Sequence, residues 1–257
     1  MKTLNRAQMF PIRDHNPSHR TPYVTYALIV VNIVVFLSYV ALFNEPRALN
    51  AFFAEWALLP ARISAGDGYE TLVSTMFMHG GWMHLAGNML FLWIFGDNME
   101  DAMGHVGFLL FYLAAGLAAA FTHVISAPDS IVPTVGASGA IAGVMGGYLL
   151  LYPKARIDIL FIFIVFFRVF QVPAWAMLGF WFVMQLFSGV GADPTTGGVA
   201  YWAHAGGFIA GLVLTLPIWL RRGGVGYWNR THGLPPNPEA KYEFAKSSVP
   251  TIRRHRK

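Results

Sequence analysis

The sequence predicts an all-α membrane protein that crosses a bilayer several times. Hydrophobic residues make up 55% of its 257 residues and charged residues only 12%, whereas an average soluble domain carries about 25% charged residues. The basic residues gather at the two ends of the chain, and long apolar runs fill the middle. The net charge of +5 therefore describes two tails that suit anionic lipid headgroups better than nucleic acid.

Six apolar runs approach the ~20 residues that a helix needs to cross a bilayer. In chain order they cover residues 23–43, 83–95 with its flanks, 106–125, 138–152, 172–190 and 201–220. We expect a basic cytoplasmic tail at 1–22, a membrane domain at 23–220, and a basic, Pro-containing, flexible cytoplasmic tail at 221–257.

A further short apolar run at 157–167 decides the topology. Lys154, Arg156, Arg168 and Pro173 bracket it tightly, which favours an interfacial or shallow segment over a full crossing. With six spans, sixteen of the eighteen Lys and Arg residues fall on one side of the membrane. Because positive loops mark the cytoplasmic side, we expect both termini in the cytoplasm. The minimal six-span form and the lack of a transit peptide favour a multi-pass protein of the cell (inner) membrane.

Ser138 and His204 lie near the starts of the fourth and sixth spans, at equal depth. Sixteen residues separate Ser138 from Lys154, and seventeen separate His204 from Arg221. At 1.5 Å per residue these are roughly 24 and 26 Å of helix, a few ångströms short of a ~30 Å hydrocarbon layer. An ionisable residue inside the membrane is a functional hypothesis by default, so the pair suggests a nucleophile and its base.

The second span adds polar residues at the same end. His84 and Asn88 are four residues apart and therefore share one helix face. A buried amide without partners costs a few kcal/mol, so Asn88 needs a partner or a role. His79 precedes two glycines at the helix start and suits structural support. At the other end of this span, Glu100 suits helix-end contacts.

Each of these signals has a packing explanation when taken alone. Gly139 and Gly143 on one span, and Gly207 and Gly211 on the other, form small-residue ladders that usually serve close helix packing. A single histidine can bond a neighbouring helix. Packing does not, however, require a serine, two histidines and an asparagine at one end of three parallel helices.

Taken in order, these motifs resemble the rhomboid family of intramembrane serine proteases. The matching segments are HGGWMHLAGN at 79–88, GASG at 136–139 and AHAGGFIAG at 203–211. The resemblance covers about residues 23–220 and implies a six-transmembrane-helix rhomboid bundle whose active site faces the extracytoplasmic side.

The resemblance also implies roles for individual residues. Ser138 would be the nucleophile and His204 the general base. The Ser138 backbone N–H and the side chains of His84 and Asn88 would form the oxyanion hole. Structural support would come from His79, Gly136, Gly139, Gly143, Gly207 and Gly211. We expect no metal and no cofactor, and the chain has no cysteine for a thiolate site.

Three features set limits on the resemblance. Ala57 follows Trp56 where many family members carry a Trp–Arg pair. Ala142 stands where some relatives place an aromatic ring that stacks on the catalytic histidine. No carboxylate is placed to orient His204, since Asp193 is eleven residues upstream in a loop.

The implied partners are transmembrane protein substrates and the lipid bilayer, and no nucleic acid. The substrate would be a single-span protein whose helix unwinds near its outer end. Two alternatives remain, a catalytically silent rhomboid-like binding or escort factor and a small transporter or channel. The retained serine and histidine weigh against the first, and the lack of internal repeats weighs against the second.

Overall fold

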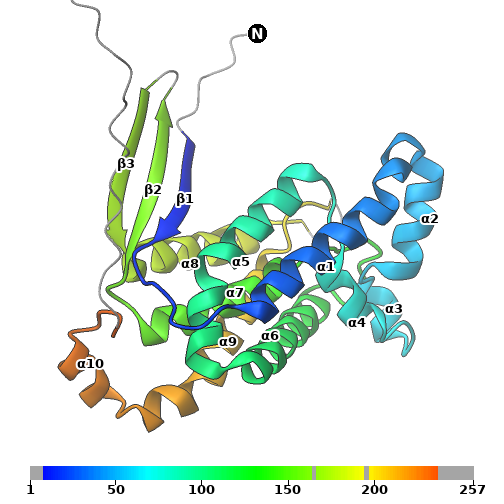
Figure 1. The fold of residues 1–257 in the computed structure, drawn as a ribbon. Helices are drawn as coiled ribbons and strands as arrows, with labels where there is room; N and C mark the ends of the chain where they lie inside the picture. Colours follow the sequence, from blue (N-terminus) through cyan, green and yellow to red (C-terminus); the bar gives the residue numbers. More distant parts are fainter. Residues whose placement is uncertain (1–7, 164–165, 194–196, 237–257) are drawn as a thin grey trace, which may run out of the picture.

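The computed structural model describes residues 8–163, 166–193 and 197–236, which form a helical bundle with a small antiparallel sheet at one end (Figure 1). Its elements are β1 (Gln8–Asp14), α1 (Tyr23–Tyr39), η1 (Val40–Asn44), α2 (Pro46–Trp56), α3 (Pro60–Ser64), α4 (Thr71–Ser74), η2 (Thr75–Phe77), α5 (Trp82–Met103), α6 (His105–Ser126), α7 (Ser138–Leu151), β2 (Arg156–Phe163), β3 (Phe166–Pro173), α8 (Ala174–Gly191), α9 (Tyr201–Arg221) and α10 (Val225–Thr231).

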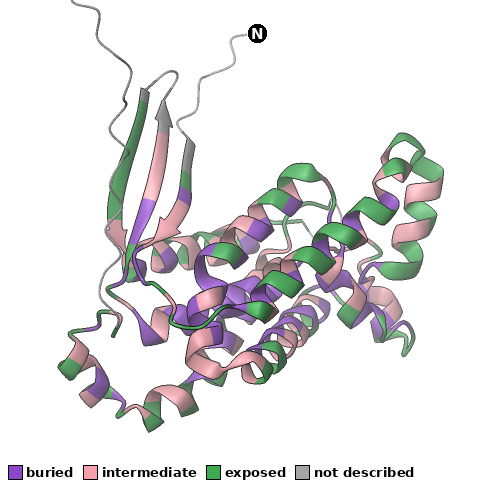
Figure 2. Cartoon of the chain, viewed as in Figure 1, coloured by how far each residue is buried: buried purple, intermediate pink, exposed green. Residues whose placement is uncertain are grey.

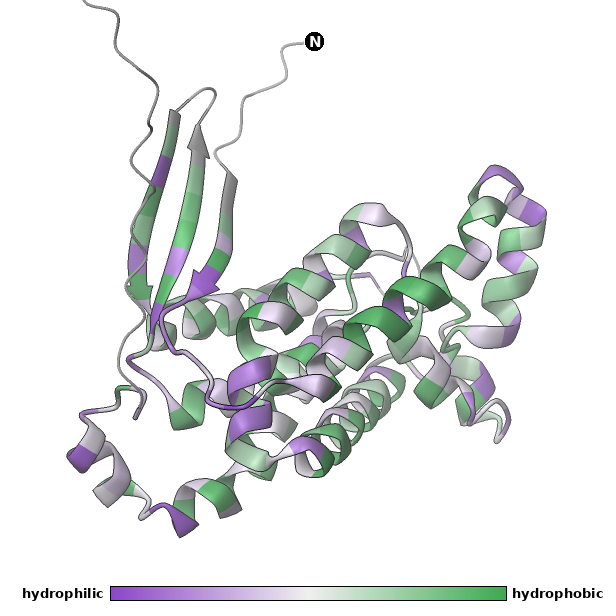
Figure 3. Cartoon of the chain, in the orientation of Figure 1, coloured by the Kyte–Doolittle hydropathy of each residue, from purple (hydrophilic) through white to green (hydrophobic). Residues whose placement is uncertain are grey.

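Helices occupy all six apolar runs that the sequence marks as spans. Four of them, α1 continued by η1, α6, α8 and α9, are long and apolar enough to cross a membrane, and Figure 3 shows the apolar residues along α1. The helix α7 is apolar but has only 14 residues, and α5 carries acidic residues in its last turns. The chain is therefore a mostly helical membrane protein.

The expectation of an all-α fold is wrong for the segment after α7. Residues 156–173 form the β2–β3 hairpin, and β1 pairs with β2 to complete a three-stranded sheet of order β1-β2-β3. The segment is rich in Ile, Val and Phe, which favour strands, and hydropathy alone does not distinguish a short strand from a helix. The expected tails also contain regular structure, namely β1 and α10.

The hairpin returns to the point from which it leaves the bundle. The N–H of Ala174 donates to the carbonyl of Ala155 at 2.8 Å, and the N–H of Trp175 donates to Pro153 at 2.9 Å. The end of α7 and the start of α8 therefore meet at the base of the hairpin.

Three segments that are distant in sequence lie at this same end of the bundle. The strand β1 precedes α1, and β2 lies between α7 and α8. After α9, the carbonyl of Gly233 accepts a 2.8 Å hydrogen bond from the N–H of Lys154. Figure 1 shows the sheet and α10 together at this end.

Polar contacts anchor β1 to β2 and to α7. Asp158 is 1% exposed and accepts hydrogen bonds from Arg13 at 2.6 Å and His15 at 2.8 Å. Burial raises the pKa of Asp158, but these two partners outweigh burial and hold the pKa below its usual value. Asp14 accepts from the Tyr148 hydroxyl of α7 at 2.7 Å, and burial raises the pKa of Asp14 to about 8.

Glu100, near the end of α5, caps the start of α1. Its carboxylate accepts from the backbone N–H groups of Val24 at 2.9 Å and Thr25 at 2.8 Å, and from the Thr25 hydroxyl at 2.7 Å. His105 bonds the same carboxylate. Glu100 thus makes helix-end contacts, as the sequence predicts, and ties α1 to α5.

The helix α7 lies at the centre of the bundle, and every residue from 139 to 148 is buried (Figure 2). Its backbone touches that of α9. A methyl group at Gly207 would overlap the carbonyl of Gly139, and one at Gly211 would overlap the carbonyl of Gly143. The glycine ladders therefore allow the backbones of α7 and α9 to approach each other directly in the N-terminal parts of both helices.

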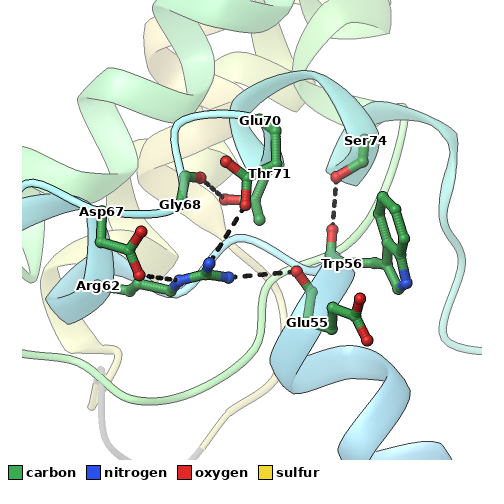
Figure 4. A network of polar contacts seen from close by, with 8 residues as sticks. All are labelled: Glu55, Trp56, Arg62, Asp67, Gly68, Glu70, Thr71 and Ser74. Atoms are coloured by element: carbon green, nitrogen blue, oxygen red, sulfur yellow. Dashed lines mark hydrogen bonds and ion pairs between the residues drawn. The ribbon is translucent and has the colours of Figure 1, made fainter.

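An arginine organises the long loop between α1 and α5. The guanidinium of Arg62 donates to the Asp67 carboxylate at 2.8 Å and to the Glu55 carbonyl at 3.3 Å (Figure 4). Ala57 follows Trp56, and the arginine that makes these contacts lies six residues after Trp56.

Candidate active site

The first residue of α7 faces a histidine of α9. Ser138 Oγ and His204 Nε2 lie 2.8 Å apart, close enough for a hydrogen bond between a nucleophile and its base. Because Ser138 begins α7, its backbone N–H belongs to the first turn, whose N–H groups have no partner within the helix.

Two side chains of α8 hold the His204 ring. Gln185 Oε1 lies 2.8 Å from Nδ1 of His204, and the Trp181 ring lies 5.7 Å from the imidazole at 33°. Sequence reasoning missed both residues because it looked for a carboxylate and for an aromatic ring at Ala142. The available signal was a tryptophan and an amide four residues apart in an apolar span.

His84 of α5 lines the same cavity as Ser138. The backbone N–H of Gly80 donates to His84 Nδ1 at 3.3 Å, so the hydrogen of the neutral ring is on Nε2. A methyl group at Gly136 would lie 2.9 Å from His84 Nε2 and 3.3 Å from Ser138 Oγ. The imidazole N–H and the serine hydroxyl therefore flank the same glycine.

Asn88 lies one turn along α5 from His84. It is 7% exposed, and its Nδ2 has no hydrogen-bond partner among the residues that the structure describes. Such buried unpaired donors are uncommon in native proteins. Asn88, His84, Ser138 and His204 all line one cavity of about 550 Å³, whose walls include Trp181.

His79 is fully buried and contacts this site through His84. The two rings meet edge to face with centroids 5.1 Å apart. The backbone N–H and carbonyl of His79 both bond the Tyr39 hydroxyl, at 2.6 and 2.8 Å. These contacts hold the start of α5 against the end of α1.

The cavity therefore combines a serine hydroxyl, a histidine within hydrogen-bond distance of it, and the N–H groups of His84 and Asn88. This set can perform acyl transfer by nucleophilic attack on a carbonyl carbon, with donors available for the developing negative charge.

A family model and several known proteins are similar to this chain. Residues 67–221 match the family model of the rhomboid domain. The chain is 28% identical to Rhomboid protein 1, mitochondrial, of Saccharomyces cerevisiae over 198 residues, which cover 74% of the chain and 51% of that protein. It is 35% identical to Rhomboid protease GluP of Bacillus subtilis over 130 residues, covering 50% of the chain and 24% of that protein.

The matched model covers more than half of the chain, which therefore belongs to the rhomboid family. The chain spans about half the length of the yeast relative and about a quarter of the Bacillus relative. A third similar protein, from Bos taurus, is named presenilin-associated rhomboid-like protein, mitochondrial, and is 34% identical over 93 residues, covering 35% of the chain and 24% of that protein. The family thus includes proteins named as proteases and others named only rhomboid-like.

Proposed function

We propose that this chain is an intramembrane serine endopeptidase that cleaves transmembrane segments of membrane proteins near their outer end. The observation that carries the proposal is the 2.8 Å contact between Ser138 Oγ and His204 Nε2. His204 takes the hydroxyl proton as Oγ attacks the scissile carbonyl, and later gives that proton to the leaving amine. Water then hydrolyses the acyl-enzyme by the same route.

The oxyanion of the tetrahedral intermediate accepts hydrogen bonds from the Ser138 N–H, His84 Nε2 and Asn88 Nδ2. The unpaired amide of Asn88 and the hydrogen on His84 Nε2 support this assignment. The N-terminal end of α7 adds a positive dipole at the same place. Removing one such donor typically costs about 10²–10³ in kcat.

We further propose that residues 23–220 form a membrane domain with six spans. The protein would lie in the cell (inner) membrane, with both termini in the cytoplasm. Sixteen of the eighteen Lys and Arg residues belong to the segments that would be cytoplasmic, which the charge rule favours. The strand β1, the hairpin and the segment after α9 lie at one end of the bundle, which supports placing both termini and the hairpin on the same side of the membrane. The helices α5, α7 and α9 begin at the opposite end, so the cavity opens toward the extracytoplasmic side.

The length of α7 supports access of water to the serine. Its 14 residues span about 21 Å, which is less than the ~30 Å hydrocarbon layer. If α7 ends at the inner boundary, Ser138 lies below the outer surface, at the base of a cavity that water enters from above.

Labelling with a serine-reactive fluorophosphonate in detergent tests this proposal, together with cleavage of a model transmembrane substrate. We expect wild type and Ser126→Ala to label and cleave, and Ser138→Ala and His204→Ala to do neither. Wild type that labels no better than Ser138→Ala would overturn the protease assignment. Substrate capture without cleavage would instead identify a silent binding or escort factor.

A further inference from the structure

We propose that Gln185 is a positioning residue that fixes the tautomer of His204. Its catalytic consequence rests on the function proposed above, whereas the tautomer itself does not. The amide of Gln185 and the hydroxyl of Ser138 each lie 2.8 Å from a different nitrogen of the His204 ring. Each ring nitrogen therefore has one hydrogen-bond neighbour, and the amide determines which of the two nitrogens carries the hydrogen.

The neighbour of the amide determines which end of Gln185 faces the histidine. A glutamine side chain offers an oxygen that accepts and a nitrogen that donates, and the surrounding hydrogen bonds decide their orientation. Gln185 Nε2 lies 3.5 Å from the backbone carbonyl of Trp181, one turn earlier in α8. A carbonyl can only accept, so the NH₂ group turns toward it and Oε1 faces His204.

The orientation of the amide sets the state of the imidazole. Because Oε1 only accepts, Nδ1 of His204 carries the hydrogen, and a neutral ring has only one. Nε2 is then left with a free lone pair toward Ser138 Oγ. The opposite tautomer would present an N–H to Ser138 and could not take its proton.

Gln185 thus has the orienting role that an aspartate has in a three-residue hydrolase site, but without a charge. When Ser138 loses its proton to Nε2, the hydrogen on Nδ1 stays where it is and no proton passes to Gln185. The helix α8 also supplies Trp181, whose ring limits rotation of the imidazole. Apolar side chains of α8 also pack on the bundle, with Phe182 stacked on Phe208 of α9.

Two substitutions separate hydrogen-bond acceptance from packing. Gln185→Met keeps the volume of the side chain but removes the acceptor. We expect kcat to fall about 10- to 100-fold, the range found when the hydrogen-bond partner of a metal-bound histidine is removed. Gln185→Glu keeps an accepting oxygen, so its kcat should stay within about threefold of wild type. The KM for a fluorogenic transmembrane peptide should not change in either variant. Met184→Leu, on an exposed face of α8, is the matched control and should behave as wild type.

The tautomer itself is measured by ¹⁵N NMR of the histidine side chains in detergent, with the His204 signals assigned from His204→Ala. We expect hydrogen on Nδ1 in wild type and Gln185→Glu, and exchange between both tautomers in Gln185→Met. Hydrogen on Nε2 in wild type, or a folded Gln185→Met with wild-type kcat, would overturn the positioning role. If wild type fails to react with a fluorophosphonate, the proposed protease function falls, while the NMR result still decides the tautomer.

Discussion

Gly136→Ala tests whether the position of His84 beside Ser138 matters for catalysis. Gly136 has a φ of +139°, a conformation that costs other residues about 1–3 kcal/mol. An added methyl group would lie 2.9 Å from both Cε1 and Nε2 of His84, whereas ordinary contacts are ~3.5–4.0 Å. The imidazole must therefore retreat by about 0.5–1 Å or rotate away.

This displacement moves one proposed oxyanion donor away from Ser138. Loss of one such donor predicts a fall of about 10²–10³ in kcat. The backbone strain and the crowding predict a loss of about 1–3 kcal/mol in the free energy of unfolding. Because the substrate helix does not need this donor before reaction, KM should change little.

The assay measures kcat and KM on a fluorogenic transmembrane peptide in detergent, together with thermal unfolding followed by tryptophan fluorescence. Gly179→Ala in α8 is the control, since an added methyl group there meets no atom of the described residues within 4 Å. A Gly136→Ala protein with wild-type kcat would refute the placement of His84 as a donor. Lost kcat with an unchanged Tm would refute only the strain argument.

Three more substitutions test contacts that support the site. Burial raises the pKa of Asp14 to about 8, so stability should fall as the pH rises from about 4 to 8. Asp14→Asn should remove this slope, and its Tm advantage over wild type should grow with pH. Gly207→Ala crowds the Gly139 carbonyl and should lower the free energy of unfolding by about 1–3 kcal/mol, measured in denaturant. Glu100→Gln weakens the bonds to Val24 and Thr25 and should lower Tm by several degrees. An unchanged unfolding curve in any of these variants would contradict the corresponding contact.

The sequence predicts the six long apolar helices because each one is a property of a single segment. An apolar run of sufficient length and its basic ends are read without knowing the neighbours. The sheet could not be predicted in this way. Its first strand pairs Asp14 with Ile157, a partner more than 140 residues away, and hydropathy does not distinguish the short run at 157–167 from a helix.

The same distinction applies to the site. The equal depth of Ser138 and His204 could be predicted because a helix has a constant rise per residue, so that the number of residues to the helix end gives a distance. The contact from Gln185 depends on how α8 is rotated and tilted against α9, and no spacing within α8 determines that.

The participation of β1 in the sheet has a practical consequence for recombinant production. A chain trimmed to start at residue 23, the expected boundary of the membrane domain, would lack β1 and with it both partners of Asp158. It would also remove Asp14, the acceptor for Tyr148 in the helix that begins with Ser138. Trimming, or a protease that cuts ahead of α1, would thus remove a contact that stabilises the C-terminal half of α7, the helix that begins with Ser138. Purification tags at this terminus belong ahead of residue 8.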